Sequence, residues 1–165
     1  MLAGVAGNSP EQEGDVGGHL EQSSEVAAVV DYFGASDLLL RAITQPSQTE
    51  TPSSIVYRLL GSAPRDNESL ARRASPACLV DEVSPPLFII HGEKDEQVQI
   101  DQAHRMVEAY ESQQRPVILE TLPEGGHGGA AFFSEKYRNQ VASFLQGHLS
   151  EEGEESSEEK GEFEK

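Results

Sequence analysis

The stretch Pro85-Pro86-Leu87-Phe88-Ile89-Ile90-His91-Gly92-Glu93-Lys94-Asp95 indicates the fold of this chain. The two prolines disfavour a helix just before an apolar run, so Leu87–Ile90 is predicted to be a buried strand. This strand leads into an acidic turn that reaches Asp95. Farther along, the run Val117–Leu122 is also strand-like, and the glycine-flanked histidine Gly125-Gly126-His127-Gly128-Gly129 follows it. A carboxylate and a histidine therefore each come directly after a predicted strand.

Helical patterns alternate with these strands. Apolar residues recur at i, i+3, i+4 and i+7 within Asp101–Gln113, which predicts an amphipathic helix. An earlier strand is predicted at Val26–Val30, with shorter helices near 37–43, 54–60 and 67–74. A closing helix is predicted from apolar residues on one face: Phe133, Tyr137, Val141, Phe144 and Leu145.

The order of these elements indicates an α/β fold with a parallel sheet. Only three strands are evident, and strands of parallel sheets are normally buried on both faces. We therefore interpret the chain as a partial α/β fold, with the last three parallel strands and their flanking helices, and expect the upstream half of the sheet to be missing.

Composition limits the classes of partner. Residues 1–150 suit one domain, whereas residues 151–165, with 8 Glu and 2 Lys, are expected to form a disordered acidic tail. The net charge of −17 argues against binding to nucleic acid or an anionic membrane. No run approaches the roughly twenty apolar residues of a membrane span. Cys78 is the only cysteine, so neither an internal disulfide nor a cysteine-based metal site is predicted.

Asp95 and His127 stand in the order of the last two members of a Ser…Asp…His triad. The glycines around His127 allow a bulky group to approach the ring, as a general base requires, and its other nitrogen needs a carboxylate. Glu93 and Glu96 are rival carboxylates. Because both loops leave the same edge of a parallel sheet, we expect an Asp95 oxygen within about 2.6–3.2 Å of a His127 nitrogen.

The nucleophile of such a triad is not evident, because the chain has no Gly-x-Ser-x-Gly motif. Ser36 is the only serine between a predicted strand and a predicted helix, but Leu38 stands where the second glycine would be. Its simplest role is as a helix N-cap, a role that Asp37 could also fill. Cys78 is interpreted as a small buried hydrophobic residue and His91 as a partly buried structural one. No histidine pair has metal-ligand spacing, so no metal is predicted.

Four segments together resemble the carboxyl-terminal part of an α/β-hydrolase esterase. The resemblance is closest to the bacterial dienelactone-hydrolase and feruloyl-esterase-like group, which is related to the prolyl oligopeptidase catalytic domain. The segments are Val26–Leu38, Ser75-Pro76, Pro85–Val98 and Gly126–Gly129. On these segments, the resemblance covers residues 1–150 of the chain.

This resemblance implies that Asp95 is the triad acid and His127 the triad base. It also implies that the nucleophile lies upstream of Met1, that no cofactor is needed, and that the intact enzyme acts on a small-molecule ester. The expected function is a serine ester hydrolase domain without its nucleophile. The alternatives are a non-catalytic interaction module and an esterase that uses Ser36. We also expect self-association through the exposed edge of the strand at Val26–Val30.

Overall fold

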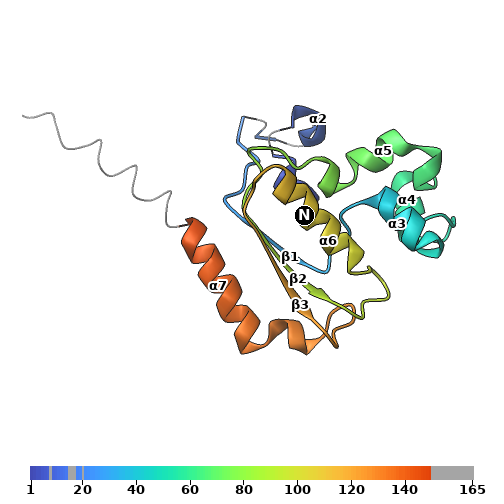
Figure 1. The fold of residues 1–165 in the computed structure, drawn as a ribbon. Helices are drawn as coiled ribbons and strands as arrows, with labels where there is room; N and C mark the ends of the chain where they lie inside the picture. The colour runs from blue at the N-terminus through green and yellow to red at the C-terminus, as the bar shows by residue number, and fades with distance from the viewer. Residues whose placement is uncertain (8, 15–17, 20, 150–165) are drawn as a thin grey trace, which may run out of the picture.

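A computed structural model describes residues 1–7, 9–14, 18–19 and 21–149 of the chain (Figure 1). The sheet has three parallel strands in the order β1-β2-β3: β1 (Val29–Tyr32), β2 (Leu87–Gly92) and β3 (Val117–Leu122). The predicted α/β class, with three parallel strands and flanking helices, is therefore confirmed. The predicted tail at 151–165 lies outside the described residues.

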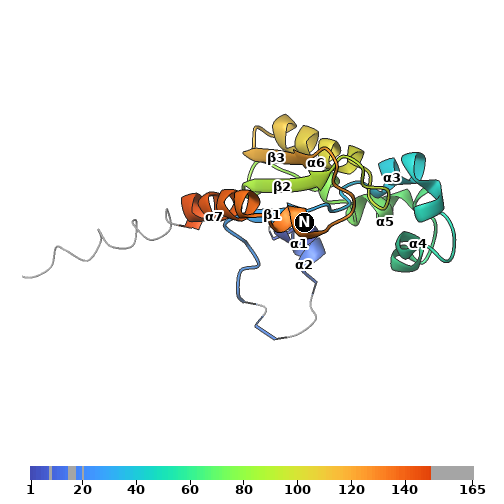
Figure 2. The same ribbon diagram turned by 90° about the horizontal axis from the view of Figure 1, so that it is seen from below.

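The helices cover both faces of the sheet (Figures 1 and 2). In chain order they are α1 (Leu2–Val5), α2 (Pro10–Glu13), α3 (Leu38–Thr44), α4 (Ile55–Leu60), α5 (Glu68–Arg73), α6 (Asp101–Ser112) and α7 (Glu135–Leu149), with 3₁₀ turns η1 (Pro46–Gln48), η2 (Pro64–Asp66), η3 (Pro76–Cys78) and η4 (Ala130–Phe133). Leu87 and Ile89 of β2 pack with α6, whereas Phe88 and Ile90 pack with η4 and α7. Strand β2 is thus buried on both faces, as a central parallel strand should be.

The first strand is shifted along the chain from its predicted position. It begins at Val29 rather than Val26 and continues to Tyr32. The reason is its register, because Val29 pairs with Leu87 and its N–H donates to the carbonyl of Pro86. The partner strand begins only after the two prolines, so the residues before Val29 have no ladder to join.

The closing helix also differs from its predicted face. Phe133 was expected on the buried face, but it lies in η4 and is 53% exposed, while Phe132 is fully buried. The 3₁₀ turn has a different angular spacing from the α-helix, which begins only at Glu135. Tyr137 and Phe144 are buried as predicted.

Strand β1 has an open edge, because β2 is its only hydrogen-bonded neighbour among the described strands. The N–H groups of Val29 and Phe33 donate to the carbonyls of Pro86, just before β2, and Ile90 in β2, so the N–H of Val30 points away from that strand. We expect the chain to self-associate through this edge. Val30→Pro removes the outward donor and keeps the bonds to Pro86 and Ile90, so light scattering after gel filtration should show a shift toward monomer. An unchanged mass distribution would contradict this.

Candidate active site

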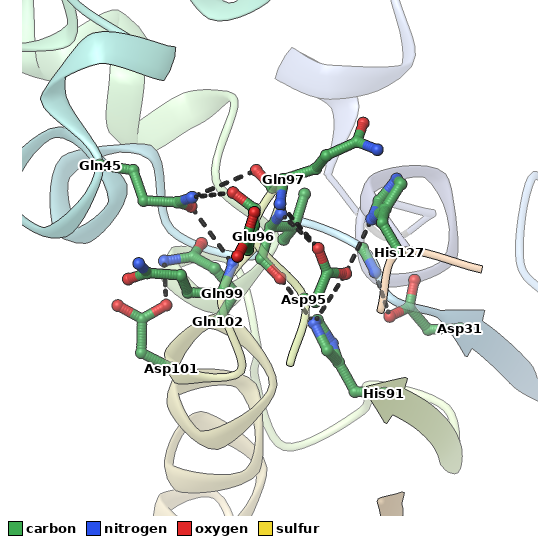
Figure 3. A network of polar contacts seen from close by, with 12 residues as sticks. Asp31, Gln45, His91, Asp95, Glu96, Gln97, Gln99, Asp101, Gln102 and His127 are labelled. Atoms are coloured by element: carbon green, nitrogen blue, oxygen red, sulfur yellow. Dashed lines mark hydrogen bonds and ion pairs between the residues drawn. The ribbon is translucent and has the colours of Figure 1, made fainter. Parts of the chain in front are cut away.

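The loops after β2 and β3 bring the two predicted site residues together. Nδ1 of His127 lies 2.8 Å from Oδ2 of Asp95, within the predicted range (Figure 3). The Asp95 side chain is fully buried, whereas that of His127 is 28% exposed. The pair therefore consists of a carboxylate held in the protein and an imidazole that a ligand can reach.

The acid loop fixes the orientation of the Asp95 carboxylate. Its Oδ1 accepts hydrogen bonds from the backbone N–H groups of Gln97 and Val98, both at 2.9 Å. This leaves Oδ2 directed at His127. The two rival carboxylates do not take this position. Glu93 accepts a hydrogen bond from the Thr121 hydroxyl, and Glu96 is exposed to solvent.

Backbone contacts hold the two loops against each other. The N–H of Glu93 donates to the carbonyl of Leu122, and that of Lys94 donates to the carbonyl of Gly125, both at 2.9 Å. This approach requires a glycine at position 92, where a Cβ atom would lie 2.3 Å from the Gly125 oxygen and 2.4 Å from the Gly126 oxygen. Both obstacles are backbone atoms, which cannot move aside as a flexible side chain can.

We expect Gly92→Ala to push the two loops apart and to lower the free energy of unfolding by about 1–3 kcal/mol, the usual cost of overpacking. Urea unfolding followed by circular dichroism measures this. Gly147→Ala is the matched control, since nothing lies within 4 Å of its added Cβ and alanine favours a helix. Equal stability of Gly92→Ala and the wild type would show that the loops are not held by this contact.

An aromatic side chain packs beside the histidine. The ring centroid of Phe33 lies 4.7 Å from that of His127, with the planes inclined by 59°, and Phe132 meets Phe33 edge to face at 5.0 Å. Phe33 follows β1 with a φ of 47°, in the left-handed region that bulky residues rarely adopt. Such strain persists where the surroundings impose it, often at functional sites. One side of the imidazole is therefore bounded by an apolar surface.

A second buried carboxylate, which the sequence reasoning missed, lies at the end of β1. Oδ2 of Asp31 accepts a hydrogen bond from the N–H of Gly34 at 3.1 Å, and the residue is 8% exposed. Burial raises the pKa of the Asp31 carboxyl, and the Gly34 hydrogen bond and the positive amino terminus oppose that rise. The sequence did contain a signal for this buried carboxylate. Asp31 interrupts the apolar run of β1 near the carboxyl end of the strand, and Asp95 follows the carboxyl end of the neighbouring parallel strand.

The raised pKa of Asp31 makes stability depend on pH. Because the native carboxyl keeps its proton to higher pH than the unfolded one, the native state loses stability as pH rises from about 3.9 through the raised value.

Asp31→Asn keeps the acceptor for Gly34 and removes the charge. We expect this variant to be more stable than the wild type at pH 7, with the difference disappearing below about pH 4. Urea titrations at several pH values test this, with the exposed Asp66→Asn as control. A less stable Asp31→Asn at pH 7 would contradict it.

Ser36 has a structural role that differs from the predicted N-cap. The cap of α3 is Asp37, whose Oδ1 accepts from the N–H groups of Leu39 and Leu40. Ser36 is fully buried, and its hydroxyl donates to the carbonyl of Gln102 at 2.6 Å. The side chain of Gln102 also accepts from the Ser36 and Asp37 N–H groups. Ser36 therefore ties the start of α3 to α6, and its hydroxyl is already used in a hydrogen bond to Gln102.

Other groups contribute little to the site. Cys78, expected to be buried, is partly exposed and has a free thiol whose pKa is raised mainly by burial, which disfavours the thiolate. Across the described residues, no three acidic, histidine or cysteine side chains are placed to share a metal ion. None of the helices described is long and apolar enough to cross a bilayer.

A parallel sheet with an acid–histidine pair on adjacent loops is the arrangement of an α/β-hydrolase-like domain. The chain belongs to the BD-FAE family, whose model matches residues 1–110. This match includes Asp95 and ends before His127.

The similar proteins include a peptidase and a carbohydrate esterase. The chain is 24% identical over 98 residues to the uncharacterized peptidase YtmA of Bacillus subtilis, covering 59% of this chain and 37% of that protein. Among solved structures, a truncated carbohydrate esterase from gut microbiota has a TM-score of 0.76 at 26% identity, covering 90% of this chain and 55% of its own. A bifunctional GH43-CE protein of Bacteroides eggerthii has a TM-score of 0.78 at 28% identity, over 89% and 20%. The chain thus spans about half or less of the length of these proteins.

Proposed function

We propose that this chain supplies the acid and the base of a Ser–His–Asp triad that hydrolyses carboxylic esters, with Asp95 as the acid and His127 as the base. The observation that carries the proposal is the 2.8 Å contact between a fully buried carboxylate and a partly exposed imidazole. The likeness to a solved carbohydrate esterase supports it.

The geometry supports a definite division of roles. Asp95 accepts the Nδ1 proton of His127, which leaves a lone pair on Nε2, on the far side of the ring. Nε2 can then take the proton of a serine hydroxyl as it attacks the ester carbonyl, and the Asp95 carboxylate stabilises the imidazolium. The same proton passes to the departing alcohol. A water molecule, activated in the same way, then releases the acid product.

The serine of this mechanism is proposed to come from polypeptide joined to Met1. Each serine that is buried in the described part of the chain is engaged elsewhere: the hydroxyls of Ser36 and Ser75 donate to backbone carbonyls, that of Ser84 donates to Asp81, and Ser54 caps α4. Met1, which directly precedes α1, lies close to the turn that follows β1. The Met1 side chain is next to Gly34, where an added Cβ would be 2.9 Å from its Cε atom. Residues preceding Met1 would thus enter near the carboxyl end of β1.

A fluorophosphonate probe, which labels activated serines, tests the proposal. We expect no labelling of the 165-residue chain. A chimaera that joins Met1 to an amino-terminal half with a Gly-x-Ser-x-Gly turn and an oxyanion hole should be labelled at the serine of that turn. Labelling of Ser36 in the chain alone would identify a different nucleophile. A folded chimaera that is neither labelled nor active would favour a non-catalytic binding role.

A further inference from the structure

We propose that the buried His91 is a positioning residue that holds the loop 95–98 so that Asp95 meets His127. His91 is the fifth residue of β2 and lies on the α6 side of the sheet, where it follows Leu87 and Ile89 in alternation. Its side chain is fully buried, more so than predicted from the sequence. The predicted effect of His91 on kcat rests on the proposed function, whereas its predicted effect on the contact between Asp95 and His127 does not.

A closed set of contacts joins His91 to the acid. Nε2 of His91 lies 2.8 Å from the carbonyl oxygen of Val98 and 3.5 Å from Oδ2 of Asp95 (Figure 3). The N–H of Val98 in turn donates to Oδ1 of Asp95 at 2.9 Å. The same peptide segment is thus held by His91 through its carbonyl and by Asp95 through its N–H. Displacing either side chain would release the turn that orients the carboxylate.

The contacts assign the tautomer of His91. A backbone carbonyl can only accept, so Nε2 must carry a proton to hydrogen bond to Val98. Nδ1 is buried and has no hydrogen-bond partner among the described residues, so a proton there would have no acceptor. His91 is therefore the Nε2–H tautomer. Its N–H dipole lies beside Oδ2 of Asp95, the same oxygen that faces His127.

Apolar packing alone would not explain a histidine at this position. Burying a polar nitrogen without a partner costs free energy, and a leucine would fill an apolar site without that cost. The four preceding residues of β2 are all apolar and buried. What the imidazole adds is a donor that reaches both the Val98 carbonyl and the edge of the Asp95 carboxylate.

Nitrogen-15 NMR of the imidazoles in the 165-residue chain tests this without any need for activity. In the wild type we expect His91 as the Nε2–H tautomer, and a slowly exchanging Nδ1–H signal from His127. His91→Leu should speed exchange of the His127 proton at least tenfold. His91→Gln, whose amide can donate to Val98 in place of Nε2, should largely restore it. The exposed His104→Leu on α6 is the control.

Two results would overturn the proposal. One is a wild-type spectrum in which His91 carries its proton on Nδ1, a measurement that holds even if His91→Leu fails to fold. The other is a His127 signal that is the same in the wild type, His91→Leu and His91→Gln.

In the chimaera, misplacement of the acid should lower kcat about 10- to 100-fold in His91→Leu with little change in KM, and His91→Gln should recover most of it. An inactive chimaera together with the expected NMR result would contradict the proposed esterase function but not the positioning role of His91. An active chimaera whose kcat is unchanged by His91→Leu would contradict the positioning role of His91 but not the proposed esterase function.

Discussion

Replacing His127 by alanine is expected to lower kcat about a millionfold in an esterase that joins this chain to a nucleophile-bearing half. The estimate is taken from the loss of the histidine in another serine hydrolase, where the triad members act as a unit. Without Nε2, no group is placed to take the proton of the serine hydroxyl as it attacks. Hydrolysis of p-nitrophenyl acetate at saturating substrate measures the effect, since kcat rather than KM reports on the chemical step.

The control for this variant is His104→Ala. His104 is an exposed histidine on α6, so its removal also takes an imidazole from the protein but leaves the site intact. Its kcat should remain within twofold of the parent. If His127→Ala and His104→Ala lose activity equally, His127 is not the base. Unchanged unfolding curves would show that the loss in His127→Ala is chemical.

The second large effect is expected from Asp95→Asn, which should lower kcat about 10⁴-fold, as the corresponding change does in another serine hydrolase. The backbone hydrogen bonds give a specific reason in this protein. The N–H groups of Gln97 and Val98 need an acceptor at the Oδ1 position, so the amide oxygen of the asparagine must remain there. Its NH₂ group then faces Nδ1 of His127 and donates to it. The histidine proton is driven to Nε2, and the base is lost.

The rival carboxylates provide the controls for Asp95→Asn. Glu93→Gln and Glu96→Gln also remove one negative charge from the same loop, but neither side chain contacts His127. Their kcat values should stay within a few-fold of the parent. A 10⁴-fold loss in either variant, with an active Asp95→Asn, would move the acid to another residue. Equal small losses in all three would point to a general field effect of charge.

Much of the fold could be predicted because its signals are local. β3 has the predicted bounds, and α6 ends one residue earlier than expected. Both signals depend only on residues within a few positions. The apolar run after two prolines predicts β2, and the regular 3.6-residue period predicts α6. β1 was displaced because its bounds depend on β2, which is more than fifty residues away. Phe133 was misassigned because the 3₁₀ turn before α7 breaks the period.

The sequence by itself determined that one aspartate and one histidine would each follow a buried strand at the same edge of a parallel sheet. That follows from residue order, since parallel strands bring their carboxyl ends together. The residues alone left Glu93 and Glu96 as rivals to Asp95, which only the family resemblance favoured. The tertiary structure showed that Asp95 meets His127 and that Gly92 lets the two loops touch. It also placed Asp31 and His91 in the buried surroundings of the site. These facts depend on contacts between residues far apart in the chain, where packing and hydrogen bonding select one partner from several of similar chemistry.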